Sequence, residues 1–85
     1  MPYSVLLKRT AEKELDGLPD RIYRTVLKRL LGLGEDPRPA GAKKLRGRAE
    51  YRLRVGDYRI LYLVDDEQRT VDVVSVAHRR EAYRR

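Results

Sequence analysis

The chain has 85 residues and carries 20 Lys and Arg against 13 Asp and Glu, a formal net charge of +7. This length accommodates one domain, residues 1–85, with a small core, and it excludes a second catalytic domain. The absence of cysteine excludes a disulfide scaffold and a thiolate zinc site, and the single histidine excludes a multi-histidine metal centre, so we expect no cofactor. The positive charge predicts a polyanionic or acidic partner.

The sequence also predicts a location. The first residues lack the apolar segment of a signal peptide, and the longest apolar run, Ile60 to Val64, is far shorter than a membrane span. We therefore expect a cytoplasmic protein with no membrane partner, which agrees with the lack of cysteine.

The first half of the chain is predicted to begin with a strand and a helix. Residues 3–7 are short and mostly apolar, which favours a strand, and Thr10 can cap a helix that follows. The apolar side chains of this helix recur at helical spacing as Ala11, Leu15 and Leu18. Gly17 and Pro19 are expected to end it.

A second and longer helix is predicted from Asp20. Its apolar stripe consists of Ile22, Val26, Leu30 and Leu33, widened by Tyr23, Leu27 and Leu31. Its outward-facing side chains are Arg21, Arg24, Lys28 and Arg29. Gly32 and Gly34 are expected to supply a left-handed cap, and Pro37 and Pro39 prevent continuation, so the two helices form an αα-hairpin.

The second half changes to the period-two pattern of a sheet. Strands are predicted at residues 51–55, 58–64 and 70–77. Gly56 and Asp57 form a two-residue turn, and the near-continuous apolar run after it predicts a central strand. The fold class is therefore α+β: an N-terminal strand and αα-hairpin packed on a small antiparallel β-sheet, with a short C-terminal tail helix.

The two-residue turn sets the pairing of the strands beside it. If the residues that flank the turn pair with each other, Arg54 lies directly opposite Arg59, and Arg52 shares their face. Like charges in a direct cross-strand pair destabilise a sheet, and a phosphate between them would remove the repulsion. The pattern therefore predicts a phosphate-binding face, with the core side left to Tyr51, Tyr58 and Tyr62.

The last strand is expected to add to this face. A four-residue loop at Asp65 to Gln68 would pair Val64 with Arg69. This register places three further side chains on the arginine face: Val74, Val76 and His78. The histidine would then lie beside the arginines, together with Arg79 and the tail residue Tyr83.

Such a set of side chains is what metal-free cleavage of RNA requires. Cations stabilise the charge that develops on the phosphorus oxygens, a proton acceptor activates the 2′-hydroxyl, and a donor protonates the leaving 5′-oxygen. Each residue also has a plain structural interpretation: the arginines as solvated surface, His78 as an exposed residue near a chain end, and Tyr83 as an anchor for the tail.

Three segments give the chain a resemblance to the RelE/ParE toxin superfamily: Lys44-Leu45-Arg46-Gly47, Tyr51-Arg52-Leu53-Arg54-Val55-Gly56-Asp57-Tyr58-Arg59-Ile60-Leu61-Tyr62 and Val76-Ala77-His78-Arg79-Arg80-Glu81-Ala82-Tyr83-Arg84. The resemblance implies a type II toxin, an mRNA interferase that enters the ribosomal A site and cuts mRNA there. Cleavage by the 2′-hydroxyl would leave a 2′,3′-cyclic phosphate without a metal. A cognate acidic antitoxin, the ribosome and mRNA are the implied partners.

The resemblance also implies roles for single residues. Arg59 matches the family's transition-state arginine, Arg79 the arginine near the leaving group, and Tyr83 the C-terminal tyrosine that orients or stacks the substrate. Arg46 matches a residue that contacts the RNA backbone. The expected RNA-binding residues are Lys43, Lys44, Arg46, Arg48, Arg52 and Arg80.

In one respect the chain departs from the superfamily's pattern. Arg52 and Arg54 replace lysines of the best-known members, and because a guanidinium stays protonated, neither is a ready general base. His78 is the natural substitute, as the acceptor or as the acid with Arg79 in support. Two other functions stay open: a ParE-like inhibitor of DNA gyrase that acts by protein contacts, and a non-catalytic RNA- or ribosome-binding module.

Overall fold

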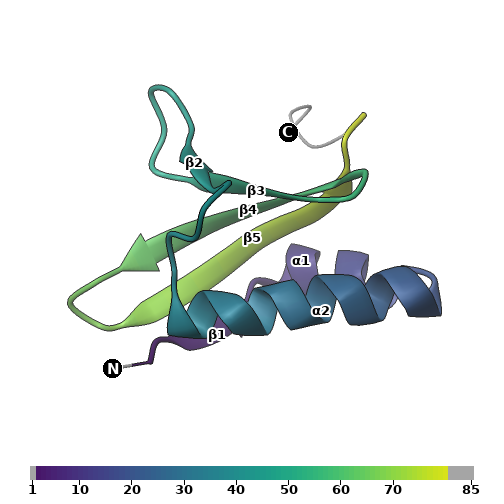
Figure 1. Ribbon diagram of the computed structural model, residues 1–85, viewed down its shortest axis with the longest axis horizontal. Coiled ribbons are helices and arrows are strands. Elements are labelled where there is room, and N and C mark those ends of the chain that lie inside the picture. Colours follow the sequence, from purple (N-terminus) through teal and green to yellow (C-terminus); the bar gives the residue numbers. More distant parts are fainter. Residues whose placement is uncertain (1, 81–85) are drawn as a thin grey trace.

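The computed structural model describes residues 2–80, in which two helices cover one face of a five-stranded sheet (Figure 1). The elements are β1 (Ser4–Leu7), α1 (Arg9–Asp16), α2 (Asp20–Glu35), β2 (Lys43–Lys44), β3 (Tyr51–Val55), β4 (Tyr58–Asp65) and β5 (Thr70–His78). The predicted α+β class is confirmed; the predicted tail helix lies outside the described residues. Within residues 2–80, no helix is long and apolar enough to cross a membrane.

The sheet is mixed, whereas a purely antiparallel one was expected. The strand order is β1-β5-β4-β3-β2, which confirms the central position of β4. β1 runs parallel to β5, and the other pairs are antiparallel. Strands joined by a two-residue turn, such as β3 and β4, must run antiparallel. Two helices separate β1 from the other strands along the chain, so β1 can run parallel to β5. β2 has only two residues, too few to produce a period-two pattern in the sequence.

The core lies between the helical layer and the sheet. Three residues of the predicted α2 stripe are buried, with Val26, Leu30 and Leu33 each at most 1% exposed. Ile22 is half-buried, and Leu31, which was expected to widen the stripe, is exposed. The three buried residues pack with buried side chains of α1 and the three long strands: Ala11, Leu15, Leu53, Val55, Ile60, Tyr62, Val71, Val73 and Val76. Burial of these side chains is the main source of stability for a domain of this size.

α1 lies against β5 where β1 ends. The Lys8 N–H donates to the carbonyl of Val73, and beyond this point the Val76 N–H donates to the carboxylate of Glu14 at 2.9 Å. The helix therefore satisfies the edge of β5 that β1 leaves uncovered. α1 begins at Arg9 after Lys8, so the expected cap at Thr10 is wrong: this residue is already in the first turn.

α2 continues through the two glycines that were expected to end it. The helix runs to Glu35, and neither Gly32 nor Gly34 is left-handed. Gly34 is buried where β1 crosses the helix, and its carbonyl accepts a hydrogen bond from the Tyr3 N–H at 2.7 Å. A Cβ at this position would lie 2.9 Å from the Tyr3 carbonyl oxygen, so the glycine permits close approach rather than a turn.

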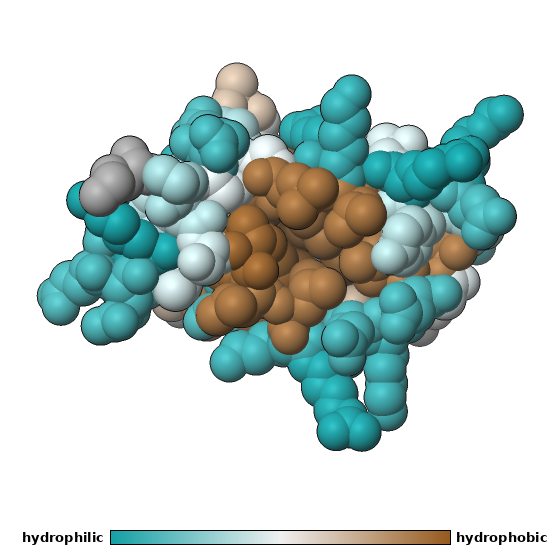
Figure 2. Space-filling model, turned by 90° about the horizontal axis from the view of Figure 1, so that it is seen from below, coloured by the Kyte–Doolittle hydropathy of each residue, from teal (hydrophilic) through white to brown (hydrophobic). Residues whose placement is uncertain are grey.

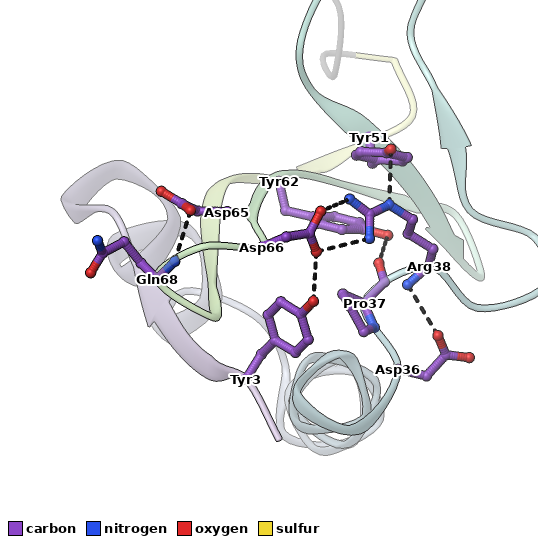
Figure 3. A network of polar contacts seen from close by, with 9 residues as sticks. All are labelled: Tyr3, Asp36, Pro37, Arg38, Tyr51, Tyr62, Asp65, Asp66 and Gln68. Atoms are coloured by element: carbon purple, nitrogen blue, oxygen red, sulfur yellow. Dashed lines mark hydrogen bonds and ion pairs between the residues drawn. The ribbon is translucent and has the colours of Figure 1, made fainter. Parts of the chain in front are cut away.

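A polar network ties the loop after α2 to the β4–β5 turn (Figure 3). Arg38 donates two hydrogen bonds to Asp66, at 3.2 and 2.9 Å, and a third to the Tyr51 hydroxyl at 3.0 Å. The Tyr3 hydroxyl also donates to Asp66, and the bonds from Arg38 and Tyr3 hold the pKa of this carboxyl below its usual range. Burial raises the pKa of Tyr62 to about 12, and its hydroxyl donates to the Pro37 carbonyl at 2.8 Å.

The two helical glycines give a matched test of this packing. Gly34→Ala should lower the free energy of unfolding by about 1–3 kcal/mol, because the added methyl group forces β1 away from α2. Gly32→Ala has open space and should raise it by up to about 1 kcal/mol through helix propensity. Urea denaturation measures the free energy of unfolding of both variants. Equal changes would mean that the close contact between Gly34 and Tyr3 does not require a glycine.

Candidate nucleic-acid interface

The β3–β4 hairpin has the predicted register. Val55 pairs with Tyr58 across the two-residue turn, in which Gly56 has a φ of +59°, and Arg54 pairs with Arg59. Leu53 and Ile60, the next pair, are buried against the helices. Because side chains alternate along a strand, Arg54 and Arg59 project from the opposite side of the sheet. The sequence prediction of a like-charged cross-strand pair is confirmed.

β2 adds a second like-charged pair to the same side. Lys43 lies directly opposite Arg52, and Arg52 shares its face with the Arg54–Arg59 pair. We call these four residues, Lys43, Arg52, Arg54 and Arg59, the cationic face. The two ion pairs among the described residues join Arg38 with Asp66 and Arg48 with Glu50, so neither neutralises the cationic face.

The three arginines of the cationic face differ in their surroundings. Arg54 is exposed, whereas Arg52 and Arg59 are half-buried. Nη1 of Arg59 donates a long hydrogen bond of 3.4 Å to the carbonyl of Tyr58, which leaves most of its donors available. Nε of Arg52 is buried and has no hydrogen-bond partner in the described part of the chain. Partly desolvated guanidinium groups attract an anion more strongly than fully hydrated ones.

The loop between β2 and β3 separates other members of the predicted RNA-binding set from this face. Lys44 pairs with Tyr51 on the other side of the sheet, and its Nζ donates to the Arg48 carbonyl at 2.7 Å. Arg48 makes two hydrogen bonds to Glu50, at 3.1 and 3.0 Å, which lower the pKa of this carboxyl. Lys44 and Arg48 thus hold the loop, while Arg46 is exposed within it.

The expected register of β5 is wrong, and this changes the surroundings of His78. The turn begins one residue later than predicted, with Asp65 opposite Thr70, which alone would leave the faces of the strand unchanged. A bulge at Val74 then adds one residue to β5, because Tyr62 pairs with Val73 and Leu61 with Ser75. From the bulge onward the two faces of β5 are reversed.

The reversal affects every residue that was expected on the arginine face. Ala77 lies opposite Arg59, Val76 is buried opposite Ile60, and Val74 is the bulged residue itself. His78 lies opposite Tyr58, with the two rings edge to face and their centroids 5.5 Å apart. Its Nδ1 accepts a hydrogen bond from the Arg80 N–H at 3.3 Å. The imidazole therefore belongs to the side of the sheet that faces the helices.

The end of β5 keeps Arg79 next to the hairpin turn. The Arg79 N–H donates to the Asp57 carbonyl at 2.7 Å, and both Arg79 and Arg80 are exposed. Tyr83 lies outside the described residues. Among residues 2–80, no three His, Cys, Asp or Glu side chains gather into a group that could hold a metal ion.

Comparison with known proteins agrees with the fold. Residues 5–83 match the model of the family described as the ParE toxin of type II toxin–antitoxin systems, parDE. The chain belongs to the RelE/ParE toxin superfamily. It is 40% identical to toxin RelG of Mycobacterium tuberculosis over 87 residues, which span 100% of both chains.

Solved structures of RelE toxins resemble the chain over nearly its whole length. The toxin–antitoxin complex RelBE2 of Mycobacterium tuberculosis gives a TM-score of 0.83 and 37% identity, covering 92% of each chain. The archaeal RelE–RelB complex of Pyrococcus horikoshii gives a TM-score of 0.83 and 31% identity, covering 96% of this chain and 100% of the other. The protein is thus a RelE-type toxin of a type II toxin–antitoxin system.

One basic residue near the cationic face was not singled out from the sequence. Arg29 of α2 lines a cavity with Lys43, Arg52 and Arg54, although its helical position indicated only an outward-facing side chain. The two-residue strand β2 brings Lys43 to the same place. No periodic pattern could have linked Arg29 to the hairpin, because the contact is between the two layers of the fold.

The cost of the like-charged pair can be measured directly. Arg54→Glu places opposite charges across β3 and β4, so it should raise the free energy of unfolding by about 0.2–1 kcal/mol at low salt. Arg46→Glu changes the net charge equally, at an exposed loop position, and is the control. Urea denaturation of both variants is the measurement. A gain no larger than that of the control would mean that Arg54 and Arg59 do not repel each other.

Proposed function

We propose that this toxin is a metal-independent endoribonuclease that acts in the cytoplasm and cuts mRNA in the ribosomal A site. The observation that carries the proposal is the direct pairing of Arg54 with Arg59 on a face that also holds Lys43 and Arg52. A cluster of uncompensated cations on a regular sheet is unfavourable unless an anion binds between them. The kinship with RelE toxins makes a phosphodiester of mRNA the fitting anion.

The proposed reaction uses the substrate's own nucleophile. The 2′-oxygen bonds to phosphorus as the bond to the 5′-oxygen breaks, water takes up the hydroxyl proton, and water supplies the proton that the leaving 5′-oxygen takes up. Arg59 and Arg54 would stabilise the charge on the non-bridging oxygens, and Arg79 the charge on the leaving oxygen. Tyr83 would orient or stack the substrate, as its match with the superfamily implies.

The bulge in β5 argues against His78 as the group that takes the 2′-hydroxyl proton. Its ring faces Tyr58, on the other side of the sheet from Arg59, so direct transfer of the 2′-hydroxyl proton to this imidazole is disfavoured. We propose instead that His78 supports the end of β5, where its Nδ1 accepts the Arg80 N–H. Catalysis would then rest mainly on charge stabilisation and on positioning of the substrate.

The surface also fits an antitoxin as partner. The similar structures from Mycobacterium tuberculosis and Pyrococcus horikoshii are toxin–antitoxin complexes, RelBE2 and RelE–RelB. Figure 2 shows apolar side chains gathered into one patch on the side that carries α2 and β1, with hydrophilic side chains around it. Leu31 and Leu6 are 63% and 51% exposed. An acidic segment with an apolar helical face would complement this patch and the charge of +7.

The proposed function is tested by translating a defined message with purified ribosomes and mapping the 5′ ends of the fragments. Arg59→Ala should lower the rate of A-site cleavage by roughly 100- to 1000-fold, because it removes a donor aimed at the scissile phosphate. The folded state should be retained, since Arg59 lies outside the buried core.

Two outcomes of this assay would contradict the proposal. If wild-type protein leaves the message intact yet arrests growth, a ParE-like attack on DNA gyrase would explain the toxicity. If Arg59→Ala cleaves at the wild-type rate, the cationic face does not contact the reacting phosphate. Arg24→Glu, at an exposed position of α2 outside the cationic face, shows how far a general change of charge affects ribosome binding.

A separate variant tests the assignment of His78. His78→Gln keeps a hydrogen-bonding side chain but cannot titrate, so cleavage by a protein with a supporting histidine should fall less than about 10-fold and keep its pH profile. Single-turnover cleavage between pH 5 and 9 is the measurement. A loss of roughly 100-fold or more, with a changed pH profile, would restore His78 as the group that moves the proton.

A further inference from the structure

A cavity of about 290 Å³ opens at the outer edge of β3, where the sheet meets α2. It is lined by side chains and backbone of three segments: Arg29, Gly41, Lys43, Arg52, Leu53 and Arg54. β2 covers only the first part of β3, since its pairing ends at Lys43 and Arg52. The rest of the β3 edge, near Arg54, is therefore open to a ligand from the side.

The lining is strongly cationic. Four of the six lining residues are Lys or Arg, and none is acidic. Lys43 and Arg52 are direct cross-strand neighbours, and neither of the ion pairs found within residues 2–80 involves any residue of this lining. Arg29 reaches the same cavity from the helical layer. Cations that converge from two layers on one concave site create a strong local attraction for an anion.

Arg52 supplies an independent observation. Its Nε atom is buried, yet it donates to no atom in the described part of the chain. Buried polar groups in folded proteins nearly always have a partner, and an unpaired donor in a functional protein calls for an explanation. The guanidinium group of Arg52 is thus partly removed from water where it borders the cavity, which strengthens its attraction for the oxygens of a phosphate.

We propose that this cavity binds one phosphate of a single-stranded nucleic acid, next to the phosphate that lies between Arg54 and Arg59. Arg29, Lys43 and Arg52 hold this second phosphate, and Arg54 borders both positions. The identity of the polymer rests on the proposed function, whereas the anion site itself does not. Arg29 thereby acts as a substrate-positioning residue contributed by the helical layer.

The first test measures binding without cleavage. A fluorescein-labelled single-stranded oligodeoxynucleotide lacks 2′-hydroxyls, so its affinity can be followed by anisotropy over a range of salt concentrations. Arg29→Ala should weaken binding about 10-fold and make the log–log salt slope shallower by about 0.7, the value for one lost phosphate contact. Arg24→Ala, also an exposed arginine of α2, lines neither this cavity nor the one near the hairpin turn and is the control.

The second test uses the wild-type protein with inorganic phosphate as probe. Titration should shift the arginine Nε–H signals of Arg29 and Arg52 in a saturable way and leave that of Arg24 unchanged. An unmoved Arg52 signal, or equal losses of oligonucleotide affinity in Arg29→Ala and Arg24→Ala, would overturn the proposal.

These experiments test phosphate binding at the cavity separately from mRNA cleavage. If the protein binds phosphate through Arg29 and Arg52 but does not cut mRNA, the proposed anion site is supported and the proposed nuclease function is rejected. If the wild-type protein cuts mRNA but Arg29→Ala and Arg24→Ala bind the oligonucleotide equally, the nuclease function is supported and the second phosphate site is rejected.

Discussion

The cross-strand pairing of Arg54 with Arg59 is the constraint around which the functional surface is arranged. A two-residue turn leaves one register for the strands on either side, and burial of Leu53 and Ile60 against the helices leaves one orientation. The arginines must then project from the opposite side of the sheet. Arg52 of the same hairpin and Lys43 of β2 complete the cationic face, so a single hairpin and its short neighbour define it.

This arrangement is tolerated because the opposite side of the sheet supplies the stability. α2 buries its apolar stripe there, and Gly34 lets β1 approach the helix closely enough for a 2.7 Å backbone hydrogen bond. The network of Arg38 and Asp66 holds the loop that leads from α2 towards β2. The helical layer thus fixes where Lys43 lies, and it places Arg29 at the edge of β3.

The sequence predicted those parts of the site that depend on local geometry. Arg54 and Arg59 are five positions apart around a tight turn, so their pairing followed from the turn alone. The sequence prediction put His78 on the wrong side of the sheet, because one bulged residue, Val74, reverses the faces of β5. A bulge cannot be recognised from the sequence within a valine-rich strand. Arg29 was overlooked because its role depends on contact between layers, which a helical pattern does not encode.

By itself the sequence determined the α+β class, the residue at which α2 begins, and the β3–β4 hairpin with its like-charged pair. Each of these follows from periodicity or from a tight turn. Only the tertiary structure decided the parallel direction of β1, the side of the sheet that His78 occupies, and the cavity that unites Arg29 with Arg52. The physical reason is the range of the interactions. Turns and amphipathic stripes are set by neighbouring residues, whereas strand direction, bulges and interlayer cavities are set by how separate elements pack.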